Sequence, residues 1–138
     1  MPATFQVARD EIQGAFLSSW GTLAPPVPKV FWDAVAGVDA EPDEPWATVF
    51  VRHNLSRPVY FTDKSGEIRK FRKTGVVTVQ VFAPVGEMGA LEEMAVKAKE
   101  AFEGKATKHD VWFRNARIRE VGVDGPWFQM NVLADFEY

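Results

Sequence analysis

The sequence predicts an α+β domain, with a mainly antiparallel β-sheet and two principal helices packed on one face. Three observations predict this class. Two segments repeat apolar side chains at helical spacing, β-branched and aromatic runs of strand length lie between and after them, and turn-forming residues join these runs in pairs. We expect residues 1–138 to form a single domain, because a chain of this length buries a core without disulfides or metal.

The two predicted helices cover residues 4–20 and 87–103. The first carries its apolar face on Phe5, Ala8, Ile12, Phe16 and Trp20. The second carries its apolar face on Met88, Leu91, Ala95, Ala98 and Phe102. Thr4 is placed to cap the start of the first helix, and Gly104 is placed to end the second.

The central part of the sequence contains the strongest strand signals, at residues 46–53 and 76–83. Residues 46–53 are apolar on both faces, which is typical of a strand covered on each side, so we expect this strand to be central. Residues 58–62 and 67–72 flank the turn-forming residues 63–66. This arrangement predicts a hairpin, more polar than the other strands.

The last part of the sequence predicts a second hairpin, formed by residues 111–121 and 127–138 around a turn at 122–126. In its final strand every second residue is apolar, namely Phe128, Met130, Val132, Ala134, Phe136 and Tyr138. Alternation of this kind indicates that one face of the strand is buried.

The composition excludes several classes of protein. There are no cysteines, which excludes thiol catalysis, disulfides and thiolate metal sites. Charges at residues 9–11 precede any apolar run of signal-peptide length, so we expect no export signal, and no apolar run is long enough to span a membrane. The net charge of −3 disfavours a dedicated nucleic-acid-binding protein.

Residue types that carry chemistry are sparse, and we expect no catalytic residues, no cofactor and no metal site. The two histidines, His53 near a strand end and His109 before a strand, are interpreted as structural. Gly86 and Gly89 at the start of the second helix suggest a phosphate site, but Glu87 places a negative charge where the anion would bind. An enzyme that uses one histidine with a nearby acid remains an alternative.

The charge is divided between two segments of the chain. Residues 33–44 are interpreted as an acidic surface loop, and the hairpin at 64–73 is basic, with aromatic residues nearby. The candidate residues for a subunit or partner contact are Asp39, Glu41, Asp43, Glu44, Lys64, Arg69, Lys70, Arg72 and Lys73. Because neither face of the basic hairpin is wholly apolar, we expect it to project beyond the core.

Three interpretations of the basic hairpin stay open: a solvated hairpin, a nucleic-acid contact through phosphates and stacking, or a contact with an acidic surface of another subunit. Opposite charges on separate patches suit a head-to-tail contact between identical subunits. If this interpretation is correct, residues 54–75 exchange fastest in a free monomer and become protected on oligomerisation.

The order of motifs resembles the tail-terminator or tail-completion family of long-tailed phages, which includes minor tail protein U. The resemblance covers most of the chain, through residues 16–20, the Pro-rich turn, Pro45-Trp46, 75–86, 102–104, 124–128 and 132–138. Its most specific part is Val-Gln-Val-Phe-Ala-Pro-Val-Gly at residues 79–86, followed three residues later by Gly89 and a helix.

The resemblance implies a non-enzymatic structural virion protein with a small α+β fold. Such a protein assembles as a ring, expected to be hexameric, at the head-proximal end of the tail tube. There it ends tube polymerisation and provides the surface for head-completion or neck proteins. The implied partners are other copies of the chain, the tail tube protein, the neck protein and genomic DNA passing through the lumen without sequence specificity, with no membrane involved.

The implied location is the virion tail, and the host cytoplasm during assembly. The alternative function is a small nucleic-acid-binding module that uses residues 64–73.

Overall fold

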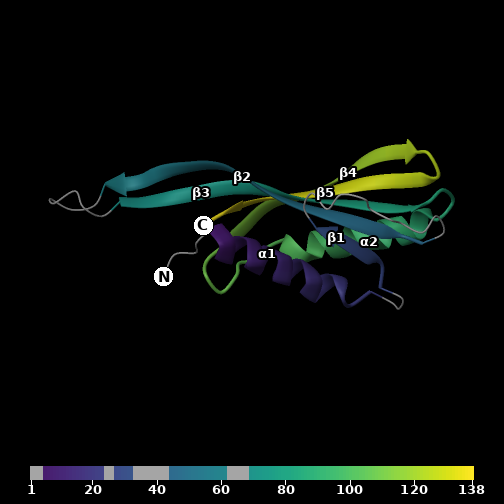
Figure 1. Cartoon of the computed structure of the whole chain (residues 1–138), viewed down its shortest axis with the longest axis horizontal. Helices are drawn as coiled ribbons and strands as arrows, with labels where there is room; N and C mark the ends of the chain where they lie inside the picture. Colours follow the sequence, from purple (N-terminus) through teal and green to yellow (C-terminus); the bar gives the residue numbers. More distant parts are fainter. Residues whose placement is uncertain (1–4, 24–26, 33–43, 62–68) are drawn as a thin grey trace.

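The computed structural model describes residues 5–23, 27–32, 44–61 and 69–138, with backbone alone for 54–61, 69–72 and 124 (Figure 1). The elements in chain order are α1 (Phe5–Trp20), β1 (Lys29–Trp32), β2 (Trp46–Phe61), β3 (Arg69–Pro84), α2 (Met88–Phe102), β4 (Trp112–Asp124) and β5 (Trp127–Glu137). Both helices lie on the same face of the sheet (Figure 1). The predicted α+β class is therefore confirmed.

The sheet has five strands in the order β1-β2-β3-β5-β4. Every neighbouring pair is antiparallel except β1 and β2, which pair in parallel over four residues each. The prediction that the strand at 46–53 is central was wrong, since β3 occupies the middle position and β2 lies beside it. The short strand β1 was not predicted.

The core lies between the helices and one face of the sheet. α1 buries Ala8, Ile12, Phe16 and Trp20, whereas Phe5, in its first turn, is 51% exposed. From α2 the buried residues include Leu91, Ala95, Ala98 and Phe102. The sheet contributes alternate residues, with Val77, Val79 and Val81 from β3 and Met130, Val132, Ala134 and Phe136 from β5. The predicted helical faces and the predicted alternation of the last strand are confirmed, apart from Phe5 and Met88 at the helix starts.

β2 and β3 are each continuous strands of 16 residues, where the sequence predicted two shorter strands in each region. Irregularities between His53 and Leu55 and between Pro58 and Tyr60 leave one residue of β2 unpaired at each place. Such bulges let a strand bend, and they accommodate proline, which lacks an amide to donate to its neighbour.

Gly75 falls between the predicted strands at 67–72 and 76–83, but in the structure it lies inside β3, opposite His53 of β2 and Phe136 of β5. A Cβ atom at this position would lie 2.2 Å from the carbonyl oxygen of Arg52 and 2.4 Å from the ring of Phe136. Glycine is therefore required at this position because a neighbouring strand and an aromatic ring approach it closely. It does not interrupt the strand.

The predicted ends of the elements are partly within the described residues. Thr4, the predicted cap of the first helix, lies outside them. Gly104 has a φ of +69°, which suits glycine after a helix end, as predicted. The C-terminal hairpin turns at Gly125 and Pro126, because Asp124 of β4 pairs with Trp127 of β5.

Candidate functional site

The most distinctive feature of the backbone is a two-stranded arm, formed by residues 54–61 of β2 and 69–72 of β3. β3 pairs with β5 only from Thr74 onward, and Lys73 exchanges two backbone hydrogen bonds with Tyr138, of 2.9 and 3.0 Å. Farther out, the pairing runs only between the two arm strands, to Phe61 and Arg69. The arm extends well beyond the helices (Figure 1). This confirms the prediction of a hairpin that projects from the core.

The base of the arm is held by an aromatic cluster around His53. Its Nε2 lies 2.8 Å from the hydroxyl oxygen of Tyr138, and its ring stacks on Phe5 with 3.7 Å between ring centroids. Phe136 meets the same imidazole ring edge to face. Burial, and then the nearby cations Arg9 and Lys73, lower the pKa of His53 below its ordinary value of 6.5. His53 is therefore a packed, neutral aromatic group, in agreement with its structural interpretation.

Tyr138 fixes the C-terminal end of this cluster. Burial raises the pKa of its phenol, although the charge of Arg9 acts in the opposite direction. The ammonium nitrogen of Lys73 lies 5.7 Å from the centre of the Tyr138 ring, within the range of a cation-π contact. Lys73 is thus the one basic residue of the predicted contact whose side chain is described, and it lies where the arm leaves the body.

The remaining predicted contact residues have the following positions. Arg69, Lys70 and Arg72 belong to the arm strand of β3. Glu44 is exposed two residues before β2 begins. Asp39, Glu41, Asp43 and Lys64 lie outside the described residues. Within one chain the two described ends of the predicted contact do not meet, because Glu44 adjoins Trp46 whereas Lys73 pairs with Ser56. Ten residues of strand between these positions span about 33 Å.

The end of the body opposite the arm carries exposed apolar side chains, and we call this group the tip. It consists of Val85 (56% exposed), Met88 (38%), Val121 (51%) and Val123 (64%). The two turns that carry them are adjacent, since the amide of Val85 donates to the carbonyl of Pro126 at 3.0 Å. Both turns lie at the right-hand end of Figure 1, with the arm at the left.

Beside the tip, four aromatic side chains gather on the sheet face that the helices do not cover. Trp46 is at the centre, stacked on Phe82 at a centroid distance of 4.0 Å and meeting Phe31 and Trp127 edge to face. The indole nitrogen of Trp46 is buried and has no hydrogen-bond partner among the described residues. The apolar residues on both faces of β2 are thus explained by this cluster and by the helices on the other side.

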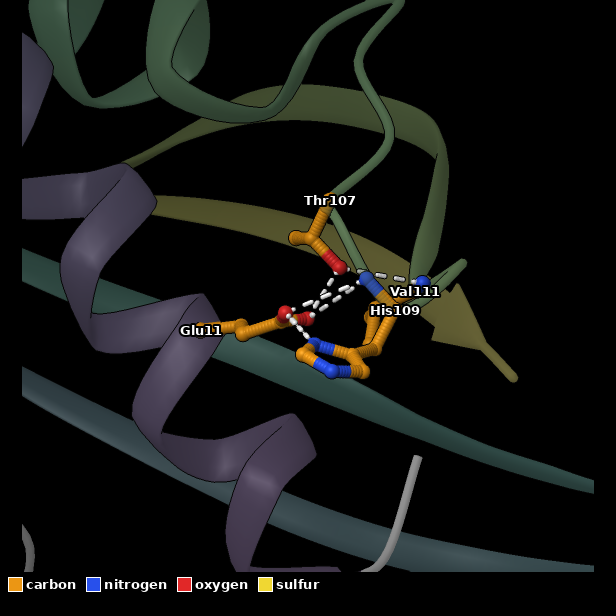
Figure 2. A network of polar contacts seen from close by, with 4 residues as sticks. All are labelled: Glu11, Thr107, His109 and Val111. Carbon is orange, nitrogen blue, oxygen red and sulfur yellow. Dashed lines mark hydrogen bonds and ion pairs between the residues drawn. The ribbon is translucent and has the colours of Figure 1, made fainter. Parts of the chain in front are cut away.

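A polar network joins α1 to the loop between α2 and β4 (Figure 2). The carboxylate of Glu11 accepts hydrogen bonds from the hydroxyl of Thr107 and from the backbone amide of His109, the latter at 3.1 Å, and it lies against Nδ1 of His109. The amide of Val111 donates to the Thr107 oxygen at 3.1 Å. One carboxylate therefore holds several groups of a tight loop.

The electrostatics of Glu11 follow from these contacts. Burial alone would raise its pKa, but the hydrogen bonds to Thr107 and His109 and the charge of His109 lower it further than burial raises it. The net pKa lies below the ordinary value of 4.5, so the ionised carboxylate is the form that holds the loop. This contact could not be predicted from the sequence, because 96 residues separate Glu11 from Thr107.

The pair of Glu11 and His109 is the arrangement that the enzyme alternative requires, a histidine oriented by an acid. An adjacent open depression of about 290 Å³ is lined by Glu11, Ala15, Lys105, Ala106, Thr107, Lys108 and Phe113. The one hydroxyl of this lining, on Thr107, is bound to Glu11 and to the amide of Val111. Because these groups bond to one another between α1 and the loop, the arrangement suits a structural staple.

In the part of the chain that the structure describes, no group of three or more histidine or acidic residues is placed to hold a metal ion. No helix among these residues is long and apolar enough to cross a membrane.

Comparison with known proteins gives fold similarity alone. No family model and no curated protein matches the chain. One solved structure, which carries a sequence identifier and no functional name, matches with a TM-score of 0.59 and 16% identity over 94% of each chain. A chain from the virion of a native gene transfer agent particle matches with a TM-score of 0.49 and 13% identity, over 97% of this chain and 98% of that one. The first similarity shows a shared fold, and the second is too low to support a functional argument.

Proposed function

We propose that this chain is a structural virion protein that forms a homo-oligomeric ring, expected to be hexameric, at the head-proximal end of a phage tail tube. In that position it ends tube polymerisation and provides the attachment surface for a head-completion or neck protein. The lumen of the ring passes genomic DNA without reading its sequence. The protein acts without catalysis, by binding.

The arm is the observation that carries this proposal. An isolated two-stranded ribbon is marginally stable in water, because it has no core to cover either face. Both outer edges of the arm leave backbone amides and carbonyls without a strand partner among the described residues. A neighbouring subunit would supply the missing cover, which is a common way for a projecting segment to be ordered on assembly.

The charge distribution supports a contact between copies of the chain. Residues 54–73 carry six basic and two acidic residues, a net charge of +4. The whole chain has a net charge of −3, so the rest of the molecule carries −7. A positively charged arm and a negatively charged body favour association of the arm of one copy with the body of the next.

The head-to-tail geometry supports a closed assembly. Glu44 is the described end of the acidic segment and lies two residues before Trp46. Along β2, about 33 Å separates Trp46 from Ser56, the residue that pairs with Lys73. A contact between these two regions therefore joins different copies, and it is heterologous. Contacts of this kind form a ring when the rotation between copies closes, and a filament when it does not.

Negative-stain imaging of the purified chain at low salt, with its mass in solution, tests the proposal. We expect rings with a central hole and a mass that is a multiple of 15.5 kDa. Rings added to tubes of the tail tube protein should bind at one end and stop elongation. A 15.5 kDa monomer at high concentration and low salt would contradict the proposal.

The same preparation distinguishes the structural function from the nucleic-acid-binding alternative. The basic arm is the feature that favours it. A monomer that binds DNA with a steep dependence on salt would support that function, because each phosphate contact releases counterions. A ring whose assembly is unaffected by DNA would support the structural function.

A further inference from the structure

We propose that the tip is the docking surface for the arm of a second copy of this chain. This inference rests on the proposed function and adds to it the two surfaces that meet. The acceptor is the apolar group of Val85, Met88, Val121 and Val123, together with the exposed Glu44.

The tip has the character of a binding surface. Single exposed apolar residues are ordinary on a protein surface, whereas a contiguous apolar patch with polar neighbours marks an interaction site. The amide of Val85 is hydrogen-bonded to the turn at Pro126, and Val123 is paired with Phe128 next to that turn. Met88 follows Val85 by three residues, so all four residues lie on or beside these two adjacent turns.

The charges around the tip match those of the arm. Glu44, Glu87 and Glu120 are exposed at this end of the body, against the exposed cations Lys29 and Arg119. Residues 54–73, the stretch of sequence that includes the arm, have a net charge of +4 and contain the apolar residues Val59, Tyr60, Phe61 and Phe71. A basic and partly apolar arm is complementary to an apolar and acidic tip.

The tip of the same molecule cannot be the arm's partner. Val123 pairs with Phe128, which pairs with Ala83, so the tip lies at the Ala83 register of β3. Lys70 of the arm lies thirteen residues away along the same strand, a distance of about 43 Å. An arm that binds a tip therefore joins two copies, and each copy has one arm and one tip to repeat the contact.

Disulfide trapping tests this contact directly, because the chain contains no cysteine. Two double variants pair Val123→Cys at the tip with Lys70→Cys or Phe71→Cys in the arm, so that both side-chain parities of the arm strand are sampled. A disulfide needs Cα atoms within about 7 Å, so neither variant can close within one chain. The matched control replaces the tip position with Val96→Cys on α2, where the valine is 46% exposed.

We expect mild oxidation of at least one double variant to give a ladder of covalent dimers, trimers and higher species, which reducing agent removes. The Val96→Cys control should give at least about tenfold less product under the same conditions, since random collisions are its only route. Each single-cysteine variant can form only a dimer linked between identical positions of two copies, and so measures tip-to-tip or arm-to-arm contact. Efficient tip-to-tip or arm-to-arm dimers would overturn the proposed contact.

A charge variant provides the second readout without oxidation. Val123→Arg places a cation where the basic arm is proposed to bind, and we expect it to raise the concentration needed for assembly more than about tenfold. Val96→Arg is the matched control and should assemble as the unmodified chain does. If rings form but neither readout distinguishes residue 123 from residue 96, the inference is wrong while the proposed function stands. If the unmodified chain does not assemble, the proposed function fails first.

Discussion

Within the single strand β3, residues 74–82 lie between β2 and β5 and bury alternate valines under the helices, whereas residues 69–72 have β2 as their strand partner. The first region has a core on one face and a hydrogen-bonded neighbour on each side. The second is part of a ribbon outside the body (Figure 1). The difference shows that the body is stabilised by its own packing, whereas the arm has only the pairing of its two strands, which is the basis of the proposal that another copy completes it.

The largest effect is expected from a core substitution in the body. Phe16 is fully buried between Trp20, Trp32 and Phe102. Phe16→Ala should lower the free energy of unfolding by about 3–5 kcal/mol, because it removes aromatic contacts and leaves a cavity. Leu17→Ala, at the neighbouring position that is 48% exposed, should change it by less than about 0.5 kcal/mol. Equal effects in urea unfolding would refute the assignment of this helix face to the core.

The junction between body and arm should be the next most sensitive region. Gly75→Ala should lower the free energy of unfolding by about 1–3 kcal/mol, since the new methyl group would meet the Arg52 carbonyl and the Phe136 ring. Gly14→Ala, in the interior of α1 with open space around it, should raise stability by about 0.5–1 kcal/mol. Thermal or urea unfolding measures both. Two changes of the same sign would contradict the close approach at Gly75.

The staple between α1 and the loop at 105–111 should contribute a comparable amount, and its contribution should depend on pH. Glu11→Gln should cost about 1–3 kcal/mol at neutral pH, because a charged acceptor of several hydrogen bonds is replaced by a neutral one. The folded-state pKa of Glu11 lies below 4.5, so this contribution is complete above pH 4.5 and is lost as the pH falls through the lowered value.

The control for the staple is Glu93→Gln on the exposed face of α2, with an expected change below about 0.5 kcal/mol. Unfolding measured from neutral to acidic pH should show the wild type and Glu11→Gln converging. Parallel curves throughout this range would show that the carboxylate does not stabilise the loop in its ionised form.

The smallest effect should come from His53 at the base of the arm. Its folded-state pKa is lower than its ordinary value of 6.5, so the unfolded chain binds this proton more readily. The free energy of unfolding should therefore decrease as the pH falls from above 6.5 through the lowered value. His53→Gln should remove this part of the pH dependence. His109→Gln is the comparison variant and should leave this part in place. An unchanged slope in His53→Gln would contradict the buried, neutral state of the ring.

The sequence predicted the parts of the fold whose signals are local. The alternation in β5 and the helical spacing in α1 each depend on one segment and its burial. β1 was missed because it has four residues, follows a proline, and exists through parallel pairing with a distant segment. The role of Gly75 could not be predicted, because its neighbours Arg52 and Phe136 are brought to it by the fold.

The candidate surfaces show the same division. The basic arm could be predicted, because its charges and turn residues are contiguous in the sequence. The tip could not, because Val85 and Val123 are 38 residues apart and meet only through two adjacent turns. The Glu11 staple depends in the same way on contacts between distant residues. Local patterns thus indicated the basic arm, and the structure was needed to propose the opposite end of the molecule as its acceptor.

Hydrogen exchange of the arm, compared with the centre of β3, tests most directly whether the arm is completed by a second copy. The two samples are the dilute chain at high salt, as a monomer, and the concentrated chain at low salt, as the assembly. Amides of residues 54–61 and 69–72 should exchange rapidly in the monomer and gain protection in the assembly, while residues 77–81 stay protected in both. Equal protection of the arm in the two samples would contradict the account.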